Sequence, residues 1–456
     1  MAHQVTSKNI PTNGEHLEKS KIAKLQLVTG AIGGLGLLAS ILYLWFGDMA
    51  KDVDPEDSAS AVRHGSYAFS WLFAVFFVLT IALGGCFWTF LHNLSNSGWG
   101  TSVRRMMENV GFVFPFLILF CIPFLFPQVQ QYLWEWMTAY GEGVARAKDN
   151  ELPSAYEGLM HSPNAHDHLL AAKVFYLNPG FWLLRFFAYF IGLGFFIWLV
   201  RRFSIAQDTE KKPGTKNLFA ARKHSSWSMI VFGVTLTFLA LDLVMALDYS
   251  WFSTMWGVYI FAGSALNSMA VLILTGIFLQ RAGYLKNVVT QEHYHIMGKL
   301  CFAFTIFWAY VSFSQFFLIW YANITEETRY FLLRNTENWN LVSLSLVFMH
   351  FALPFLALLR SDVKKKPKFM VILCFYILLM HVVDVYHMII PERGPSVGLV
   401  VDHAPQLWLS GSWFGDILAL IVTVSGFLFI YLRHLSSAAL YPHRDPRILE
   451  SANLHN

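Results

Sequence analysis

Residues 66–92 read SYAFSWLFAVFFVLTIALGGCFWTFLH, a run without a single Asp, Glu, Lys or Arg. A helix needs about 20 apolar residues to cross a hydrocarbon core about 30 Å thick. Lipid offers no hydrogen-bond partners, so the backbone of such a run must satisfy its own N–H and C=O groups by forming a helix. This run therefore predicts a transmembrane helix.

The same reasoning applies along the whole chain. Of its 456 residues 55% are hydrophobic and only 14% are charged, whereas soluble domains carry about a quarter charged residues. The net charge of +4 is small and spread over the loops, so nucleic acid is not an expected partner. We predict an all-α polytopic membrane protein with ten transmembrane helices. The predicted spans are residues 25–47, 66–92, 107–128, 179–201, 227–248, 254–280, 298–321, 339–360, 369–390 and 411–433.

Metal binding and disulfide bonds are not predicted. The four cysteines all lie in apolar runs and none belongs to a CxxC pair, which disfavours a disulfide framework, a zinc site and an iron–sulfur cluster. His161, His166 and His168 in the long loop 129–178 could ligate a metal. A solvated or partner-contacting loop is the favoured interpretation, so we expect no metal site and no bound cofactor in this chain.

Basic residues are distributed unevenly between the two sides of the predicted membrane. The two termini and the loops on their side hold 24 of the 33 Lys and Arg residues, and the loops on the opposite side hold eight. Cytoplasmic loops carry the excess of Lys and Arg in membrane proteins. The tails 1–24 and 434–456 are therefore predicted to be cytoplasmic, and loop 129–178 is predicted to face outward.

An internal repeat divides the spans into two four-helix bundles. Trp227 precedes Asp242 by 15 residues, and Phe369 precedes Asp384 by the same number. Both aspartates lie in apolar runs, and the even number of spans between them predicts a parallel repeat. The predicted bundles are residues 66–248, including loop 129–178, and residues 254–390, with spans 25–47 and 411–433 at their periphery.

Several ionisable groups fall inside predicted spans. Such groups cost about 2.5–3.5 kcal/mol on insertion scales and usually line a bundle interior. At a rise of 1.5 Å per residue, Asp242 and Asp384 are expected about 22 Å from the cytoplasmic ends of their helices. His381 and His387 lie three residues on either side of Asp384, so the three share one helix face, and His350 on the preceding span lies at a similar depth. The proton-relay candidates are His350, His381, Asp384, His387, Asp242 and, near the cytoplasmic mouth of span three, Glu108.

Further polar side chains are expected to line the interior beside these groups. They recur at helical spacing, which places them on one side of each span. Ser and Thr in membrane helices also bond their own backbone or join helices, and that purely structural role is the alternative interpretation. The predicted lining residues are Ser264, Asn267, Thr305, Ser312 and Gln315 in the second bundle and Arg185 and Tyr189 in the first.

Over residues 66–430 the chain resembles the NrfD/polysulfide-reductase type of quinol-interacting membrane subunit. It is most similar to the second quinone-binding-type subunit of bacterial alternative complex III, a quinol:cytochrome c oxidoreductase. The most specific stretches are MALD at 245–248, WFST at 251–254, GVY at 257–259, FSQ at 313–315 and LIWYANI at 318–324. Where relatives often have histidine after proline, this chain has Tyr249-Ser250.

The resemblance implies a multi-pass subunit of the bacterial inner membrane, in a respiratory complex that oxidises menaquinol or ubiquinol. The implied partners are a sister membrane subunit of the same type, haem-c subunits, a periplasmic iron–sulfur subunit and a terminal cytochrome oxidase, besides lipids. Quinol could bind in this chain or only in its sister, so a catalytic role of its own stays open. Two alternatives stay open as well: a haem b-type subunit that uses His350 and His381, and a secondary transporter.

Overall fold

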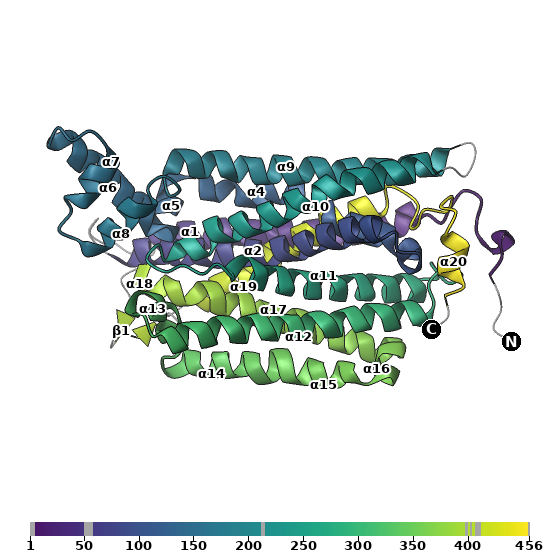
Figure 1. The fold of residues 1–456 in the computed structure, drawn as a ribbon. Helices are drawn as coiled ribbons and strands as arrows, with labels where there is room; N and C mark the ends of the chain where they lie inside the picture. Colours follow the sequence, from purple (N-terminus) through teal and green to yellow (C-terminus); the bar gives the residue numbers. More distant parts are fainter. Residues whose placement is uncertain are drawn as a thin grey trace.

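The computed structural model describes residues 5–49, 58–210, 215–396, 400–401, 404–405 and 412–454. Within these residues ten helices are long and apolar enough to span a membrane, and they lie side by side (Figure 1). They match the ten predicted spans one for one, which confirms an all-α polytopic membrane protein. The described strands form one antiparallel pair, β1 (Val400–Val401) and β2 (Ala404–Pro405).

The long helices form two groups with α2 and α11 at the centre. Besides contacting each other, α2 packs against α17 of the second group and α11 packs against α10 of the first. The division into two parallel, repeated bundles stays a prediction, and the helices are described below in those two groups. The first bundle contains α2 (Ser58–Ser95), α3 (Arg104–Gly111), α4 (Ile118–Cys121), α9 (Pro179–Ala206) and α10 (Lys216–Leu243). The second contains α11 (Trp256–Arg281), α12 (Gln291–Ala322), α14 (Glu337–Ser345), α15 (Leu353–Leu359) and α17 (Pro367–Ile389). At the periphery α1 (Lys19–Met49) packs against α19 (Ser412–Leu435).

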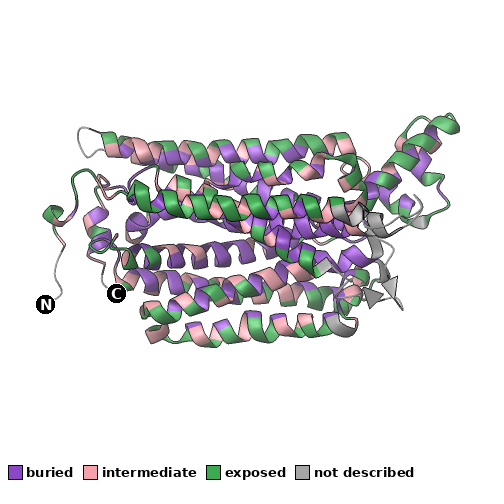
Figure 2. Cartoon of the chain, turned by 180° about the vertical axis from the view of Figure 1, so that it is seen from behind, coloured by how far each residue is buried: buried purple, intermediate pink, exposed green. Residues whose placement is uncertain are grey.

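Glycines allow α2 to lie against its neighbours at very short range. A Cβ atom at Gly84 would lie 2.0 Å from the Ser264 carbonyl oxygen, and one at Gly85 would lie 2.5 Å from the Gly111 backbone nitrogen. Small residues permit such close approach of membrane helices. As a result α2 is buried along its apolar length, whereas the outer helices expose one face (Figure 2).

The third span is interrupted, as the prolines in its sequence predict. Short 3-10 segments that contain Pro115 and Pro123 separate α3 from α4 and α4 from α5 (Pro127–Leu133). Proline removes a backbone donor and clashes with the preceding turn, so a continuous α-helix cannot form here. The irregular backbone of this span lies on the side of the first bundle that faces α1 and α19.

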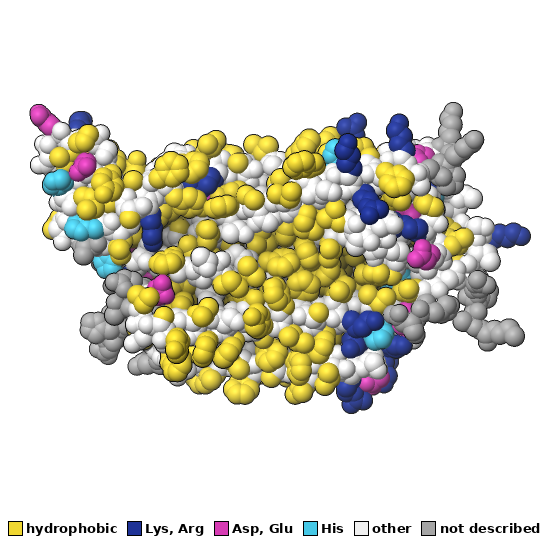
Figure 3. Space-filling model, in the orientation of Figure 1, with side chains coloured by type: hydrophobic (Ala, Val, Ile, Leu, Met, Phe, Trp, Pro, Cys, Tyr) yellow, Lys and Arg dark blue, Asp and Glu magenta, His cyan; other side chains and the backbone are white. Residues whose placement is uncertain are grey.

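The two ends of the bundle differ in structure and in charge. Loop 129–178 folds into three helices that lie beyond the bundle at one end, and both termini lie at the other end (Figure 1). There Val5 N donates to Asn453 Oδ1 at 2.8 Å, and Leu440 N donates to the Glu15 carbonyl at 2.8 Å. Lys and Arg side chains gather at the end with the termini (Figure 3). The helices of the loop are α6 (Glu135–Asp149), α7 (Ala155–Met160) and α8 (Ala165–Lys173), and the remaining short helices are α13 (Thr325–Arg334), α16 (Ser361–Lys365), α18 (Arg393–Ser396) and α20 (Ile448–Ala452).

The side of the membrane on which each end lies stays a prediction and can be tested by labelling. A cysteine introduced at the exposed position His166 is expected to react with a membrane-impermeant maleimide in intact cells. One introduced at the exposed position Asn13 is expected to react only after lysis, because the basic end is predicted to face the cytoplasm. The four native cysteines are buried and give little background. Labelling of the Asn13 variant in intact cells would reverse the topology.

Candidate functional site

A buried polar cluster surrounds Asp384 in the interior of the second bundle. Its carboxyl group accepts hydrogen bonds from the Tyr259 hydroxyl and, at 3.2 Å, from Trp308 Nε1. His381 Nδ1 lies 3.8 Å from the same carboxyl group, and His381 Nε2 is 2.8 Å from Thr80 Oγ1. Asp384, His381 and Thr80 are each 1% exposed. The cluster therefore joins α2, α11, α12 and α17 at the interface of the two bundles.

His350 lies beside this cluster on a widened turn of span eight. The segment Leu346–Ala352 between α14 and α15 is π-helical, a feature that was not predicted. Pro354 explains it, because proline lacks an N–H and clashes with the carbonyl four residues earlier, which here belongs to His350. The His350 ring meets Trp308 edge-on with a centroid distance of 4.2 Å. Both of its nitrogens are buried without a hydrogen-bond partner among the described residues.

His387, the third member of the predicted stripe, does not bond to Asp384. Its Nε2 is 2.9 Å from Ser343 Oγ, and its backbone carbonyl accepts from Arg334 Nε at 2.9 Å. Arg334 also pairs with Glu392 at 3.0 Å. His387 thus contacts α14 and the last residue of α13, one turn further along α17 from the Asp384 cluster.

The predicted polar lining of the second bundle mostly bonds its own helices. Ser264 donates to the Ile260 carbonyl at 2.7 Å, and Asn267 donates to the Gly263 carbonyl at 2.7 Å. Thr305 donates to the Cys301 carbonyl at 2.9 Å. These hydrogen bonds to their own helix backbone fit the alternative interpretation, in which the polar side chains have a purely structural role. Gln315 is buried and Ser312 is half-buried on the same helix, α12. Trp308, also on α12, is the side chain of this helix that bonds to Asp384.

Asp242, at the matching position of the first bundle, is held by an arginine. Arg185 donates from Nε and Nη2 to the two carboxylate oxygens, both at 2.8 Å, and the Tyr189 hydroxyl donates at 2.6 Å. The guanidinium also lies 3.8 Å above the Tyr176 ring and 4.4 Å above the Phe181 ring. Bidentate Arg–carboxylate pairs fix both geometry and charge. Arg185 and Tyr189 therefore lie beside Asp242 as expected. Arg185 forms an ion pair with it, and Tyr189 donates a hydrogen bond to it.

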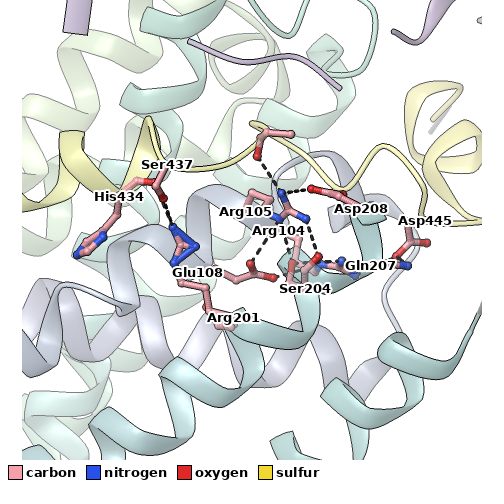
Figure 4. Close-up of polar contacts among 12 residues, drawn as sticks. Arg104, Arg105, Glu108, Arg201, Ser204, Gln207, Asp208, His434, Ser437 and Asp445 are labelled. Carbon is pink, nitrogen blue, oxygen red and sulfur yellow. Dashed lines mark hydrogen bonds and ion pairs between the residues drawn. The ribbon is translucent and has the colours of Figure 1, made fainter. Parts of the chain in front are cut away.

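Glu108 lies in a separate cluster at the end with the termini (Figure 4). Its carboxylate lies 3.3 Å from Arg104 Nε and 3.7 Å from Arg105 Nε. Arg104 also pairs with Asp445 at 2.9 Å, and Arg105 with Asp208 at 2.8 Å. The cluster ties α3, the end of α9 and the C-terminal tail together. These pairs are typical of a structural carboxylate, so we do not include Glu108 in the relay proposed below.

Asp445 links the C-terminal tail to this cluster, and its charge state can be predicted. Burial raises its pKa, whereas Arg104 and Arg447 lower it, and the net pKa lies below the ordinary value of an aspartate. A lowered pKa in the folded state contributes stability that is present above the unfolded value, about 3.9, and is lost as the pH falls through the folded value. At neutral pH the carboxylate is therefore fully available to Arg104.

Replacing Asp445 by asparagine is expected to loosen the tail. The loss of a charged partner from a buried guanidinium costs about 1–3 kcal/mol, so limited proteolysis of the C-terminal tail should become about tenfold faster or more. Asp362→Asn is the matched control, because Asp362 pairs with Arg360 at 3.1 Å on the exposed surface. Equal cleavage rates in the two variants would contradict a stabilising role for Asp445.

The histidines of the second bundle do not fit a shared haem. Trp308 contacts His350 on one side and Asp384, the neighbour of His381, on the other. The Trp308 indole thus packs against the His350 ring, and a haem bound by this imidazole would have to displace the indole. The Nε2 atom of His381 is also directed at Thr80. His381 belongs to the hydrogen-bonded cluster around Asp384, and His350 packs against Trp308 at its edge.

Two members of the cluster, Tyr259 and Thr80, were not among the predicted site residues. Tyr259 could have been suspected, because a buried tyrosine hydroxyl usually needs a hydrogen-bond partner. Thr80 gave no comparable signal.

The chain matches no protein-family model and no curated protein sequence.

Proposed function

We propose that this chain is an integral membrane subunit of a quinol-oxidising respiratory complex, and that its second bundle conducts protons through Asp384, His381, Tyr259 and His350. The resemblance of residues 66–430 supports the membership in such a complex. The proposed partners are a sister subunit of the same type, haem-c subunits, an iron–sulfur subunit and a terminal oxidase. The proposed location is the bacterial inner membrane.

One observation carries the proton-conducting role. Among the described residues Asp384 forms no ion pair with Lys or Arg, and its neighbours at the membrane interior are a phenol, an indole and an imidazole. A carboxyl group without a fixed cation can change its protonation state at the smallest electrostatic penalty. Each imidazole can both donate and accept a proton through its two ring nitrogens, so His381 and His350 are candidate members of the path.

The contrast with Asp242 supports the same assignment. Protonating Asp242 would leave the Arg185 guanidinium buried and unpaired, which is strongly unfavourable. The first bundle therefore offers a fixed ion pair at the position where the second bundle offers a titratable group. We assign a structural role to Asp242 and the proton-transfer role to Asp384.

Purification of the tagged chain in a mild detergent tests the membership in a complex. We expect c-type haem absorbance and non-haem iron to elute together with the tagged chain in fixed proportion. The same purification from cells that lack the haem-c subunits provides the control. Elution of the chain alone, with a substrate gradient driving uptake in vesicles, would favour the secondary transporter.

A further inference from the structure

A cavity of about 490 Å³ lies between α1, α2 and the irregular end of span three. It is near the end of the bundle that lies opposite the termini, because α1 ends and α2 begins there. None of the proposed proton-conducting groups lines it. Ligand cavities in proteins commonly measure about 300–1,000 Å³ and combine apolar walls with a few polar groups, and this cavity has both properties.

The walls of the cavity are apolar, with uncharged polar groups between them. Leu37 and Ile41 of α1 form one wall, and Ala68 and Trp71 of α2 form part of the opposite wall. Among the described residues, the lining contains no Lys, Arg, Asp or Glu. A ligand that fits here has a hydrocarbon body and an uncharged hydrogen-bonding group. The polar side chains of the lining are Ser40, His64, Tyr67, Gln128 and Tyr132.

The Tyr67 hydroxyl is available to such a ligand. Tyr67 is 7% exposed, and its hydroxyl makes no hydrogen bond of good geometry with a described residue, although it lies near the Ser40 hydroxyl. The nearby Ser40 hydroxyl donates to the Gly36 carbonyl at 2.8 Å, and Trp71 Nε1 donates to the Phe120 carbonyl at 2.7 Å. Leaving a buried hydroxyl unsatisfied is costly. A carbonyl acceptor in the cavity would satisfy it.

The cavity reaches the lipid-facing surface through α1. Leu37 and Ile41 line the cavity and are still 47% and 53% exposed. The other side of α1 packs tightly on α19, where a Cβ atom at Gly36 would lie 2.8 Å from Val422 Cγ2. Thus α1 packs along α19, and the cavity separates it from this part of α2. Phospholipid is the most abundant amphiphile in a bilayer, so mass action favours it over scarcer ligands.

We propose that this cavity binds a membrane phospholipid. Its acyl chain lies along the apolar wall of α1, and a glycerol-ester carbonyl accepts a hydrogen bond from the Tyr67 hydroxyl. The charged headgroup lies outside the cavity, at the membrane interface. This site is independent of the proposed proton relay and of the proposed complex.

Lipid retention in variants tests the proposal. Ala68→Phe fills the cavity from α2, and Ala31→Phe, on the exposed side of α1, is the control of equal bulk. Each tagged chain is purified in mild detergent and analysed by native mass spectrometry. We expect the wild type and Ala31→Phe to retain one phospholipid molecule and Ala68→Phe to have lost it. Equal phospholipid content in Ala68→Phe, or a retained molecule with a quinone spectrum in place of the phospholipid, would overturn the proposal.

Tyr67→Phe provides a second test that keeps the shape of the cavity. Delipidated protein is titrated with phosphatidylethanolamine in detergent, and the thermal unfolding midpoint reports binding. Loss of one hydrogen bond predicts about fivefold weaker binding in Tyr67→Phe. A short-tailed ubiquinone analogue is titrated in parallel and should raise the midpoint less than the phospholipid. Unchanged phospholipid affinity in Tyr67→Phe would overturn the proposed hydrogen bond even if Ala68→Phe failed to fold.

Discussion

Replacing Asp242 by asparagine is expected to lower the free energy of unfolding by about 3–5 kcal/mol, because it leaves a buried charge without its partner. The side chains of Arg185 and Asp242 are 9% and 3% exposed, so solvent screens the pair little. The asparagine still accepts from Tyr189 but cannot neutralise the guanidinium. Unfolding of the purified chain by titration with sodium dodecyl sulfate, followed by circular dichroism, measures the effect.

A double variant separates charge from packing in this test. Replacing a buried ion pair by apolar residues of similar volume is often neutral or stabilising, so Arg185→Met combined with Asp242→Leu should recover most of the lost stability. The double-mutant cycle then gives the coupling energy of the pair directly. A change below about 0.5 kcal/mol in Asp242→Asn, the size typical of surface substitutions, would contradict a structural ion pair.

The ten spans could be predicted because they depend on local composition alone. A run such as residues 66–92 must be helical in lipid whatever it packs against. The prolines of span three likewise interrupt the helix through their own covalent structure. Pro354 is the same kind of local signal, because it interrupts the regular hydrogen bonding at the π-helical turn that contains His350.

The partners of Asp384 could not be predicted, because they come from distant parts of the chain. Tyr259 and Thr80 precede Asp384 by 125 and 304 residues. Tyr259 contacts Asp384, and Thr80 contacts its neighbour His381. Both depend on the close approach of α2 and α11 at Gly84, and the relative rotation of packed helices cannot be derived from one sequence. His381 and His387 share a helix face with Asp384, as helical spacing requires, yet His387 bonds to Ser343 on another helix.

The two aspartates at matching positions of the predicted repeat differ in chemistry. Each follows an aromatic residue, Trp227 or Phe369, by 15 residues, and each accepts a hydrogen bond from a tyrosine hydroxyl. The difference lies in Arg185, which has no counterpart in the described surroundings of Asp384. The sequence already contains that arginine within an apolar span, and such a charge at membrane depth is usually paired.

Asp384→Asn is expected to slow proton transfer through the second bundle about tenfold or more while leaving the fold intact. The one carbonyl oxygen of asparagine can accept from Trp308 Nε1, and its amide NH2 can donate to the Tyr259 hydroxyl, which can rotate to accept. No cation loses its partner, so the change in unfolding free energy should stay within about 1 kcal/mol. The amide, however, cannot take up and release a proton at neutral pH, and losing a positioned proton-transfer group typically slows a reaction by 10²–10⁴-fold. Asp242→Asn should show the opposite pattern, with a large loss of stability.

Quinol-driven proton release from vesicles that contain the purified complex tests the role of Asp384 most directly. Wild type, Asp384→Asn and the Arg185→Met/Asp242→Leu double variant are compared at equal complex content, with the oxidation of quinol and the pH outside the vesicles recorded together. We predict that Asp384→Asn releases fewer protons per quinol oxidised than the wild type and that the double variant, once assembled, does not. Unchanged proton release per quinol in Asp384→Asn would contradict the relay and leave the cluster as a contact between helices.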